Sequence, residues 1–322
     1  MDAITLLVLA DPGARELAML AALPDTTTIA VGLTPEAFAR TGSRADVILN
    51  SEADAKFLEQ VWRMAPRVRW VHSLSAGLDG KLFPELVESP VPLTNARGVF
   101  SDALGEFAIG AVLFFAKDFR RLVRSQMAGV WDPFDVVAVR GQSLGIVGYG
   151  DIGRAIASRG HALGMKVLAL RRRPEQSRED PPASQIFGPD QKHEMLAQSD
   201  YVVVTMPLTA ESRGLIGERE FAVMKPGAVL INIGRGPVVD EAALIDALEQ
   251  KRIRGAALDV FDVEPLPPGH PFYRLENVLL SPHSADNTAG WKEQSMQVFL
   301  ENFERFRRGE PLVNVVNKKL GY

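Results

Sequence analysis

Short runs of apolar residues recur along the chain, and the segments between them have apolar positions at helical spacing. In the first third, the apolar runs are ITLLVLA (4–10), DVILN (46–50) and VRWVHSL (68–74), and the helical segments span about 15–23 and 52–63. Strands that alternate with helices in this way are typical of a parallel α/β sheet. We therefore expect an α/β domain at the start of the chain.

A second set of strands follows one long apolar helix, which we expect over about 101–127. Each new run has four to six apolar residues with little polar alternation, which favours strands buried on both faces. Six such strands separated by helices predict a doubly wound dinucleotide-binding domain. The runs are LGIVG (144–148), KVLAL (166–170), YVVVT (201–205), AVLINI (228–233), GAALDV (255–260) and NVLLS (277–281).

The order of these segments predicts two Rossmann-like α/β domains with parallel sheets. After a last helix over about 287–308, the tail GEPLVNVVN (309–317) is too short to form a domain, so we expect it to pack on the first one. The dinucleotide-binding domain, residues 98–288, would then be inserted in a discontinuous substrate domain of residues 1–97 and 289–322. The segment 172–191 is rich in proline and charge and is expected to be a surface connection.

Composition narrows the class of protein. A net charge of -4 argues against nucleic-acid binding, and the absence of cysteine excludes disulfides, thiolate nucleophiles and cysteine-ligated zinc. No two histidines have metal-ligand spacing, so no metal is expected. The longest apolar run, FAIGAVLFFA (107–116), is about half a membrane span, and the N-terminus does not resemble a signal peptide. We expect a cytoplasmic protein without a membrane partner.

A glycine-rich turn stands where a dinucleotide fold needs one. Gly148, Gly150 and Gly153 have G-x-G-x-x-G spacing, and with Asp151 and Ile152 they join a predicted strand to a predicted helix. In this context the glycines permit a tight turn, close approach of a pyrophosphate and close packing of helix on strand. An overlapping G-x-S-x-G match, GQSLG (141–145), puts its serine before a strand rather than on a strand-to-helix turn, so a serine hydrolase is rejected.

Three ionisable residues follow predicted strand ends: Arg235, Glu264 and His283. Because ligands bind at the carboxyl ends of parallel strands, we expect these side chains to converge beside the nucleotide. A guanidinium grips a carboxylate in two places, an imidazole exchanges a proton with a hydroxyl or ketone, and a carboxylate stabilises the imidazolium. Together they predict hydride transfer on a 2-oxo or 2-hydroxy acid. His72, near the loop SAG (75–77), is the main rival for a direct role.

These motifs resemble the D-isomer-specific 2-hydroxyacid dehydrogenase family along nearly the whole chain. The resemblance rests on GYGDIGRAIASRGHALGMKV (148–167), INIGRGPVVDEAALIDAL (231–248), GAALDVFDVEPLP (255–267) and NVLLSPHSA (277–285), with SLSAGLDG (73–80) as the substrate loop. It implies His283 as acid/base, Glu264 as its partner and Arg235 as the carboxylate clamp. It also implies a homodimer formed through the dinucleotide domain. Small acids such as glyoxylate and hydroxypyruvate are the default substrates, and Glu264 disfavours formate dehydrogenase activity.

The resemblance further implies two sets of binding residues. The backbone of Ala76 and Gly77 would hold the substrate carboxylate. Further cofactor contacts would come from Thr205, Pro207, Ile233 and Asp259. A nucleotide-sensing protein like the corepressor branch of the same family is the alternative to an enzyme.

The strand KVLAL departs from the pattern of NAD-binding members. Such a strand usually ends on an acid about 20 residues beyond the fingerprint, where it binds the ribose 2′-hydroxyl. Here Arg171 stands eighteen residues after Gly153, followed by Arg172 and Arg173. Arg171 and Arg172 could pair with a 2′-phosphate, although the sequence does not decide which two of the three face the nucleotide. We therefore expect NADP(H) to be preferred over NAD(H).

Overall fold

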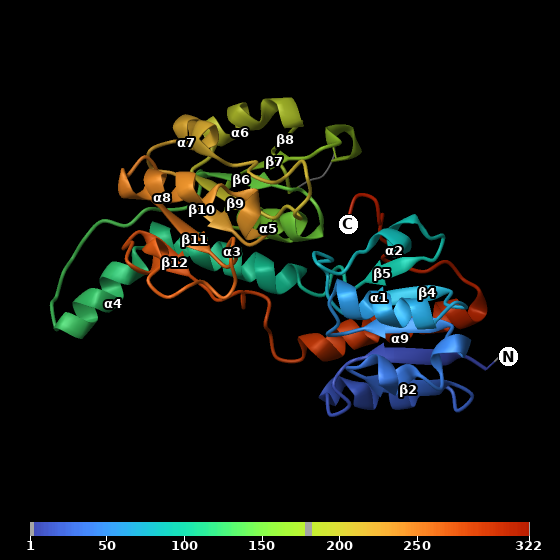
Figure 1. The fold of residues 1–322 in the computed structure, drawn as a ribbon. Coiled ribbons are helices and arrows are strands. Elements are labelled where there is room, and N and C mark those ends of the chain that lie inside the picture. The colour runs from blue at the N-terminus through green and yellow to red at the C-terminus, as the bar shows by residue number, and fades with distance from the viewer. Residues whose placement is uncertain (1–2, 178–181, 322) are drawn as a thin grey trace. The chain divides into compact units, whose positions relative to one another are not determined.

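The structure is a computed structural model that describes residues 3–177 and 182–321. The chain folds into two compact units, one of Met1–Val99 with Ala289–Tyr322 and one of Phe100–Thr288. Each unit contains one sheet in which the named strands all pair in parallel (Figure 1). This confirms the expected fold class of two parallel-sheet α/β units.

The first unit has five strands in the order β2-β1-β3-β4-β5. One face is covered by α1 and α2, and the other by the 3-10 helix η1 and the long helix α9, whose Phe299 and Phe303 are fully buried. The tail packs on this unit as expected, because Val315 pairs antiparallel with Thr94. The elements are β1 (Thr5–Leu9), η1 (Arg15–Ala22), β2 (Thr28–Gly32), β3 (Val47–Asn50), α1 (Ala55–Met64), β4 (Trp70–Ser73), α2 (Pro84–Glu88), β5 (Leu93–Asn95) and α9 (Trp291–Arg308).

The second unit has seven strands in the order β12-β11-β10-β9-β6-β7-β8. Helices α6, α7 and α8 pack on one face, and α3 and α5 pack on the other, where Gly160 of α5 lies against Leu144 (Figure 1). The strands are β6 (Ser143–Val147), β7 (Lys166–Leu170), β8 (Gln185–Phe187), β9 (Tyr201–Val204), β10 (Val229–Asn232), β11 (Gly255–Leu258) and β12 (Val278–Leu280). The helices are α3 (Ser101–Ala116), α4 (Phe119–Ala128), α5 (Asp151–Ala162), α6 (Lys192–Gln198), α7 (Glu218–Val223) and α8 (Glu241–Glu249).

The expected long helix over 101–127 is wrong, because the chain breaks after α3. Asp118 has a left-handed backbone (φ 48°), and its carboxylate accepts a hydrogen bond from Arg121 N at 3.3 Å. Asp118 therefore ends one helix and caps the next, and its side chain supplies the capping bond that favours the break. The second helix, α4, leaves the sheet and projects from its unit (Figure 1).

The connection expected over 172–191 is also wrong in part. Its residues Gln185–Phe187 form β8, the edge strand that pairs with β7. Residues 178–181 of that segment lie outside the described residues. None of the helices in the described parts of the chain is long and apolar enough to cross a membrane.

Candidate active site

The glycine fingerprint forms the turn between β6 and α5. Gly148 has φ +105°, which side-chain-bearing residues rarely adopt, and a Cβ on Gly153 would lie 2.3 Å from the Gly148 carbonyl oxygen. A Cβ on Gly150 would meet nothing within 4 Å, so the backbone there is open to a ligand. Helix α5 begins at Asp151, directly after this turn, and its first N–H groups have no intrahelical acceptor. This cradle fits a dinucleotide pyrophosphate.

Thr205, Ile233 and Pro207 are further predicted cofactor residues, and Thr205 contacts this turn directly. Thr205 follows β9 and donates its hydroxyl to the Gly148 carbonyl oxygen at 2.6 Å. Ile233 follows β10 and is almost fully buried, with its N–H donating to the Val204 carbonyl at 3.1 Å. The carbonyl of Pro207 accepts from the Ser212 hydroxyl at 2.6 Å.

The three arginines lie at the end of β7. Arg171 directly follows the last strand residue, Leu170, and donates its N–H to the Phe187 carbonyl of β8 at 3.0 Å. Arg172 forms an ion pair with Glu211. Arg171 is half-buried, whereas Arg172 and Arg173 are exposed. The structure therefore places no acid at the first three positions after this strand.

Arg235 lies in the tight turn after β10. Asn232, the last residue of β10, shapes this turn: its side-chain N–H donates to the Arg235 carbonyl at 3.1 Å, and its Oδ1 accepts from Gly234 N at 3.1 Å. The guanidinium donates to the Gly234 carbonyl at 2.7 Å. The turn thus holds the half-buried arginine at the carboxyl edge of the sheet.

His283 and Glu264, two of the three ionisable residues that follow strand ends, form a direct pair. His283 Nδ1 lies 2.6 Å from Glu264 Oε2, and the other carboxylate oxygen of Glu264 accepts from Phe261 N at 2.9 Å. Both side chains are partly exposed, at 44% for the histidine and 34% for the glutamate. Because Nδ1 faces the carboxylate, Nε2 is the ring nitrogen left to exchange a proton with a substrate.

Asp259 holds the turn that carries this histidine. Its carbonyl oxygen accepts from His283 N at 2.9 Å, and its Oδ1 accepts from Ser284 N and Ala285 N at 2.9 and 3.0 Å. Asp259 is only 2% exposed, so at this position, where a cofactor contact is expected, the structure shows a support for the loop that carries His283.

Asp286 is a charged member of this cluster that the sequence analysis did not identify. Burial raises the pKa of Asp286; among its charged neighbours, His283 and Arg235 lower that pKa and Asp259 raises it. These four groups are thus close enough to influence one another at one end of the second sheet. The only sequence signal is the position of Asp286 three residues after the histidine, in HSADN.

The loop SLSAGLDG (73–80) of the first unit presents two neighbouring N–H groups. Ala96 N donates to the Ser75 carbonyl at 3.3 Å, and the Asn95 side chain donates to the Ala76 carbonyl at 2.7 Å. These bonds fix two successive peptide planes, so the N–H groups of Ala76 and Gly77 point away from β5. Within residues 3–177 and 182–321, neither N–H has an acceptor. Two adjacent fixed donors of this kind fit a carboxylate.

The rival histidine, His72, belongs to the core of the first unit. It is fully buried beside Trp70 and Phe299, and its Nδ1 lies 2.7 Å from the Thr94 hydroxyl oxygen. Burial lowers the pKa of His72 to about 3. A neutral, enclosed imidazole in β4 cannot reach a substrate.

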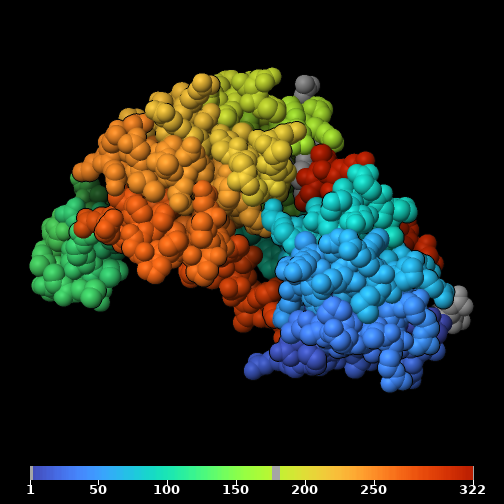
Figure 2. All heavy atoms as spheres, in the orientation of Figure 1, coloured from blue at the N-terminus to red at the C-terminus, as the bar shows by residue number. Residues whose placement is uncertain are grey.

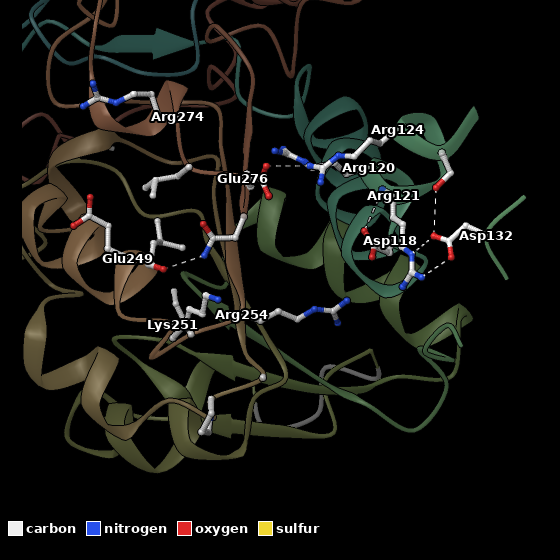
Figure 3. Close-up of a pocket in the computed structure, with 17 residues that line it drawn as sticks. Asp118, Arg120, Arg121, Arg124, Asp132, Glu249, Lys251, Arg254, Arg274 and Glu276 are labelled. Carbon is white, nitrogen blue, oxygen red and sulfur yellow. Dashed lines mark hydrogen bonds and ion pairs between the residues drawn. The ribbon is translucent and has the colours of Figure 1, made fainter. Parts of the chain in front are cut away.

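A separate hollow of about 910 Å³ lies at the amino ends of the second unit's strands (Figure 3). Arg254 precedes β11 and Asn277 precedes β12, while Arg120 and Arg124 reach the hollow from α4. Arg124 pairs with Glu276 at 3.4 Å. None of the predicted site residues lines this hollow, so it is distinct from the cluster at the carboxyl ends.

Comparison with known proteins agrees with this geometry. The family model "D-isomer specific 2-hydroxyacid dehydrogenase, NAD binding domain" matches residues 109–285. A glyoxylate reductase from Thermococcus gammatolerans is 36% identical over 272 residues, which cover 81% of this chain and 80% of the relative. One from Aeropyrum pernix is 33% identical over 294 residues, covering 88% and 85%. A D-isomer-specific 2-hydroxyacid dehydrogenase from Xanthobacter autotrophicus, solved with NADPH and MES, has a TM-score of 0.83 at 30% identity, with all of both chains covered.

Proposed function

Because the chain belongs to the D-isomer-specific 2-hydroxyacid dehydrogenase family, we propose that it reduces small 2-oxo acids, such as glyoxylate and hydroxypyruvate, to 2-hydroxy acids, with the D configuration wherever the product is chiral. The observation that carries this proposal is the pairing of His283 with Glu264 in the same charged cluster as Arg235. Curated relatives that are glyoxylate reductases support the choice of small acids. These reductase relatives also support an enzyme rather than a nucleotide sensor on the same fold.

The proposed roles follow from the chemistry of each side chain. His283 donates a proton to the ketone oxygen from Nε2, and Glu264 stabilises the imidazolium through Nδ1. Arg235 grips the substrate carboxylate and the developing alkoxide, because a guanidinium offers two parallel donors. The role proposed for the fixed N–H groups of Ala76 and Gly77 is to donate to the substrate carboxylate. A nicotinamide cofactor, held at Gly148–Gly153 and near Thr205, Pro207, Ile233 and Asp259, supplies the hydride when it is bound.

We also propose that the enzyme prefers NADP(H). Arg171 and Arg172 occupy the positions after β7 where an acid would repel a 2′-phosphate, and both can donate to one. The structural relative from Xanthobacter autotrophicus was solved with NADPH. A charged turn without a role in binding would explain the arginines but would not explain the missing acid.

A homodimer formed through the second unit is the proposed assembly. Helix α4 projects from this unit and has no buried residue (Figure 2). A ten-residue helix is marginal in water without tertiary packing, so a covering surface is needed to stabilise it. A second copy of the chain, placed by two-fold symmetry, supplies that surface in the simplest closed assembly.

One experiment tests the proposed reaction. Purified protein is mixed with NADPH or NADH and each of a panel of 2-oxo acids, including glyoxylate, hydroxypyruvate and pyruvate, while nicotinamide absorbance is followed. We expect saturable oxidation of the cofactor, and product analysis on a chiral column should show the D-isomer for acids that yield a chiral product. The Arg235→Lys variant should lose most of kcat/KM, because an ammonium cannot make the forked contact. A wild type that oxidises neither cofactor with any acid of the panel would overturn the proposal.

A further inference from the structure

Lys81 is a partly buried cation in the segment between β4 and α2 of the first unit. Its ammonium contacts two hydroxyl oxygens, Ser73 Oγ at 3.5 Å and Ser75 Oγ at closer range. In the parts of the chain that the structure describes, no carboxylate lies within ion-pair distance of Lys81 Nζ. Burial lowers the pKa of Lys81, because desolvation disfavours its charged form. Burying a cation here costs free energy of folding unless a ligand supplies a compensating negative charge.

The hydroxyls of Ser73 and Ser75 are neutral, so they do not offset the charge of Lys81. Each hydroxyl oxygen accepts a hydrogen bond from the ammonium. An ammonium only donates hydrogen bonds, so Ser75 Oγ must accept from Lys81. The hydroxyl hydrogen of Ser75 therefore points elsewhere, and the hydrogen bonds of the described residues include no acceptor for it. Ser73 Oγ is likewise an acceptor, from Lys81 and from Ser75 N at 3.3 Å.

The available hydroxyl of Ser75 lies next to the fixed N–H groups of Ala76 and Gly77. Three consecutive residues thus offer hydrogen-bond donors, and a cation stands behind the first of them. Concentrated donors and positive charge without a protein anion are the features of an anion site. A loop stabilised only by its own contacts would not require this arrangement.

We propose that Ser75 donates to the substrate carboxylate and that Lys81 is the positioning residue that orients and polarises this hydroxyl. The inference rests on the proposed function and specifies the substrate more narrowly: the site selects ionised 2-oxo acids over neutral ketones of the same shape. Lys81 raises the affinity for the carboxylate without taking part in proton or hydride transfer. The carboxylate keeps its charge during reduction, so this contribution acts equally in the ground state and the transition state.

The test compares Lys81→Met, Lys81→Arg and Ser75→Ala with wild type. A hydrogen bond to a charged group contributes about 1.5 to 3 kcal/mol, so Ser75→Ala should raise KM for the best 2-oxo acid roughly tenfold or more. Lys81→Met should raise it by a similar factor, kcat should change little, and Lys81→Arg should recover part of the affinity. Lys56→Met is the matched control, since it removes an exposed lysine from the same unit and should leave KM unchanged.

Two further readouts separate recognition of charge from a structural effect. The dissociation constant of oxamate, a non-reducible 2-oxo-acid mimic, is measured by calorimetry on the cofactor complex and should rise with KM. The preference for a 2-oxo acid over its methyl ester should narrow in Lys81→Met and in Ser75→Ala. If Lys81→Met fails to fold, the Ser75→Ala variant alone tests the inference, because it removes one oxygen atom and leaves the lysine in place.

The outcomes distinguish this inference from the proposed function. If wild type reduces 2-oxo acids but Ser75→Ala and Lys81→Met retain its KM, oxamate affinity and ester discrimination, the roles of Ser75 and Lys81 are wrong and the reaction stands. If wild type neither reduces any 2-oxo acid nor binds oxamate, the proposed function itself is overturned, and the inference with it.

Discussion

His283 has a backbone conformation that its surroundings must enforce. Its φ of +51° lies in the left-handed region, which costs a non-glycine residue about 1 to 3 kcal/mol. The three hydrogen bonds from the turn to Asp259 over-determine this conformation, and Glu264 fixes the ring. The strain is therefore associated with the placement of Nε2, which is the atom that the proposed proton transfer requires.

His283→Ala should remove this proton transfer and leave cofactor binding intact. A well-placed acid/base group contributes about 10² to 10⁴-fold, so kcat should fall by that range while the NADPH dissociation constant stays near its wild-type value. Glu264→Gln should reduce kcat less, since an amide still orients the ring but lacks the negative charge. Steady-state kinetics and fluorescence titration measure both quantities. His161→Ala, an exposed histidine of the same unit, is the control. Near-normal turnover by His283→Ala at neutral pH would contradict the assignment.

His72 should make the stability of the first unit depend on pH. Its folded-state pKa of about 3 lies below the ordinary value of 6.5. Below pH 6.5, His72 therefore binds a proton in the unfolded chain but not in the folded chain. Stability contributed by the neutral histidine is complete above pH 6.5 and is lost as pH falls toward 3. The slope approaches about 1.4 kcal/mol per pH unit.

Urea unfolding of wild type and His72→Gln at pH 7, 6 and 5 measures this slope. Three of the four tryptophans, Trp62, Trp70 and Trp291, lie in the first unit, so intrinsic fluorescence mainly reports its unfolding. The variant will be less stable at pH 7, because the contact with Thr94 changes, but its stability should fall less steeply with acid. Parallel pH dependences in the two proteins would show that another group controls the acid transition.

At the scale of elements, the strands buried on both faces were the most predictable part of the fold. Runs such as KVLAL and GAALDV are apolar without alternation, and each formed a parallel strand near its predicted position. Strands β2, β5 and β8 were not identified, since they are short or at a sheet edge and their sequences are mixed. The α3–α4 break was missed because apolar spacing continues through Asp118, where a single backbone angle redirects the chain.

The part of the candidate site that the sequence predicts is the part whose position depends on strand ends alone. Arg235, Glu264 and His283 were found because parallel strands deliver their following residues to one edge. The sequence pattern did not reveal Asp286 or Lys81. Both residues matter because of the groups that surround them in space. Asp286 belongs to a charged cluster, and Lys81 contacts two serine hydroxyls.

The end of β7 should decide the choice of cofactor. Arg171→Asp and Arg172→Ala should each lower kcat/KM with NADPH roughly ten- to a hundredfold, because each loses a contact to a charged group worth about 1.5 to 3 kcal/mol. With NADH, Arg172→Ala should change kcat/KM far less. Glu211→Gln releases Arg172 from its ion pair and should leave NADPH activity intact or raise it. The measurement is the NADPH/NADH ratio of kcat/KM, with Arg173→Ala for comparison. A wild type that favours NADH, or variants that weaken both cofactors equally, would leave the arginines as a charged turn.

At the scale of the whole molecule, α4 and the residues after it form an apolar surface that stays exposed to solvent in a single chain. Apolar side chains here are widely exposed, by 56% at Val123, 85% at Met127 and 95% at Trp131. Neighbouring apolar residues that stay in water together usually mark an interaction site. The helix and the following segment belong to one continuous stretch, so one partner surface can cover them. In a dimer with a two-fold axis, each copy covers this stretch of the other copy.

We therefore expect wild type to have twice the 35.2 kDa mass of one chain by size-exclusion chromatography with light scattering at micromolar concentration. Placing two carboxylates on this surface, by combining Met127→Glu with Trp131→Glu, should shift the mass toward that of one chain, because burying unpaired charge in an apolar interface is costly. Leu33→Glu, at a side chain 47% exposed on the first unit, adds a similar charge elsewhere and should leave the dimer intact. The dimer assignment fails if wild type is monomeric under these conditions. If instead the double variant keeps the full dimer mass, α4 is not part of the interface, and another surface of the second unit must hold the two copies together.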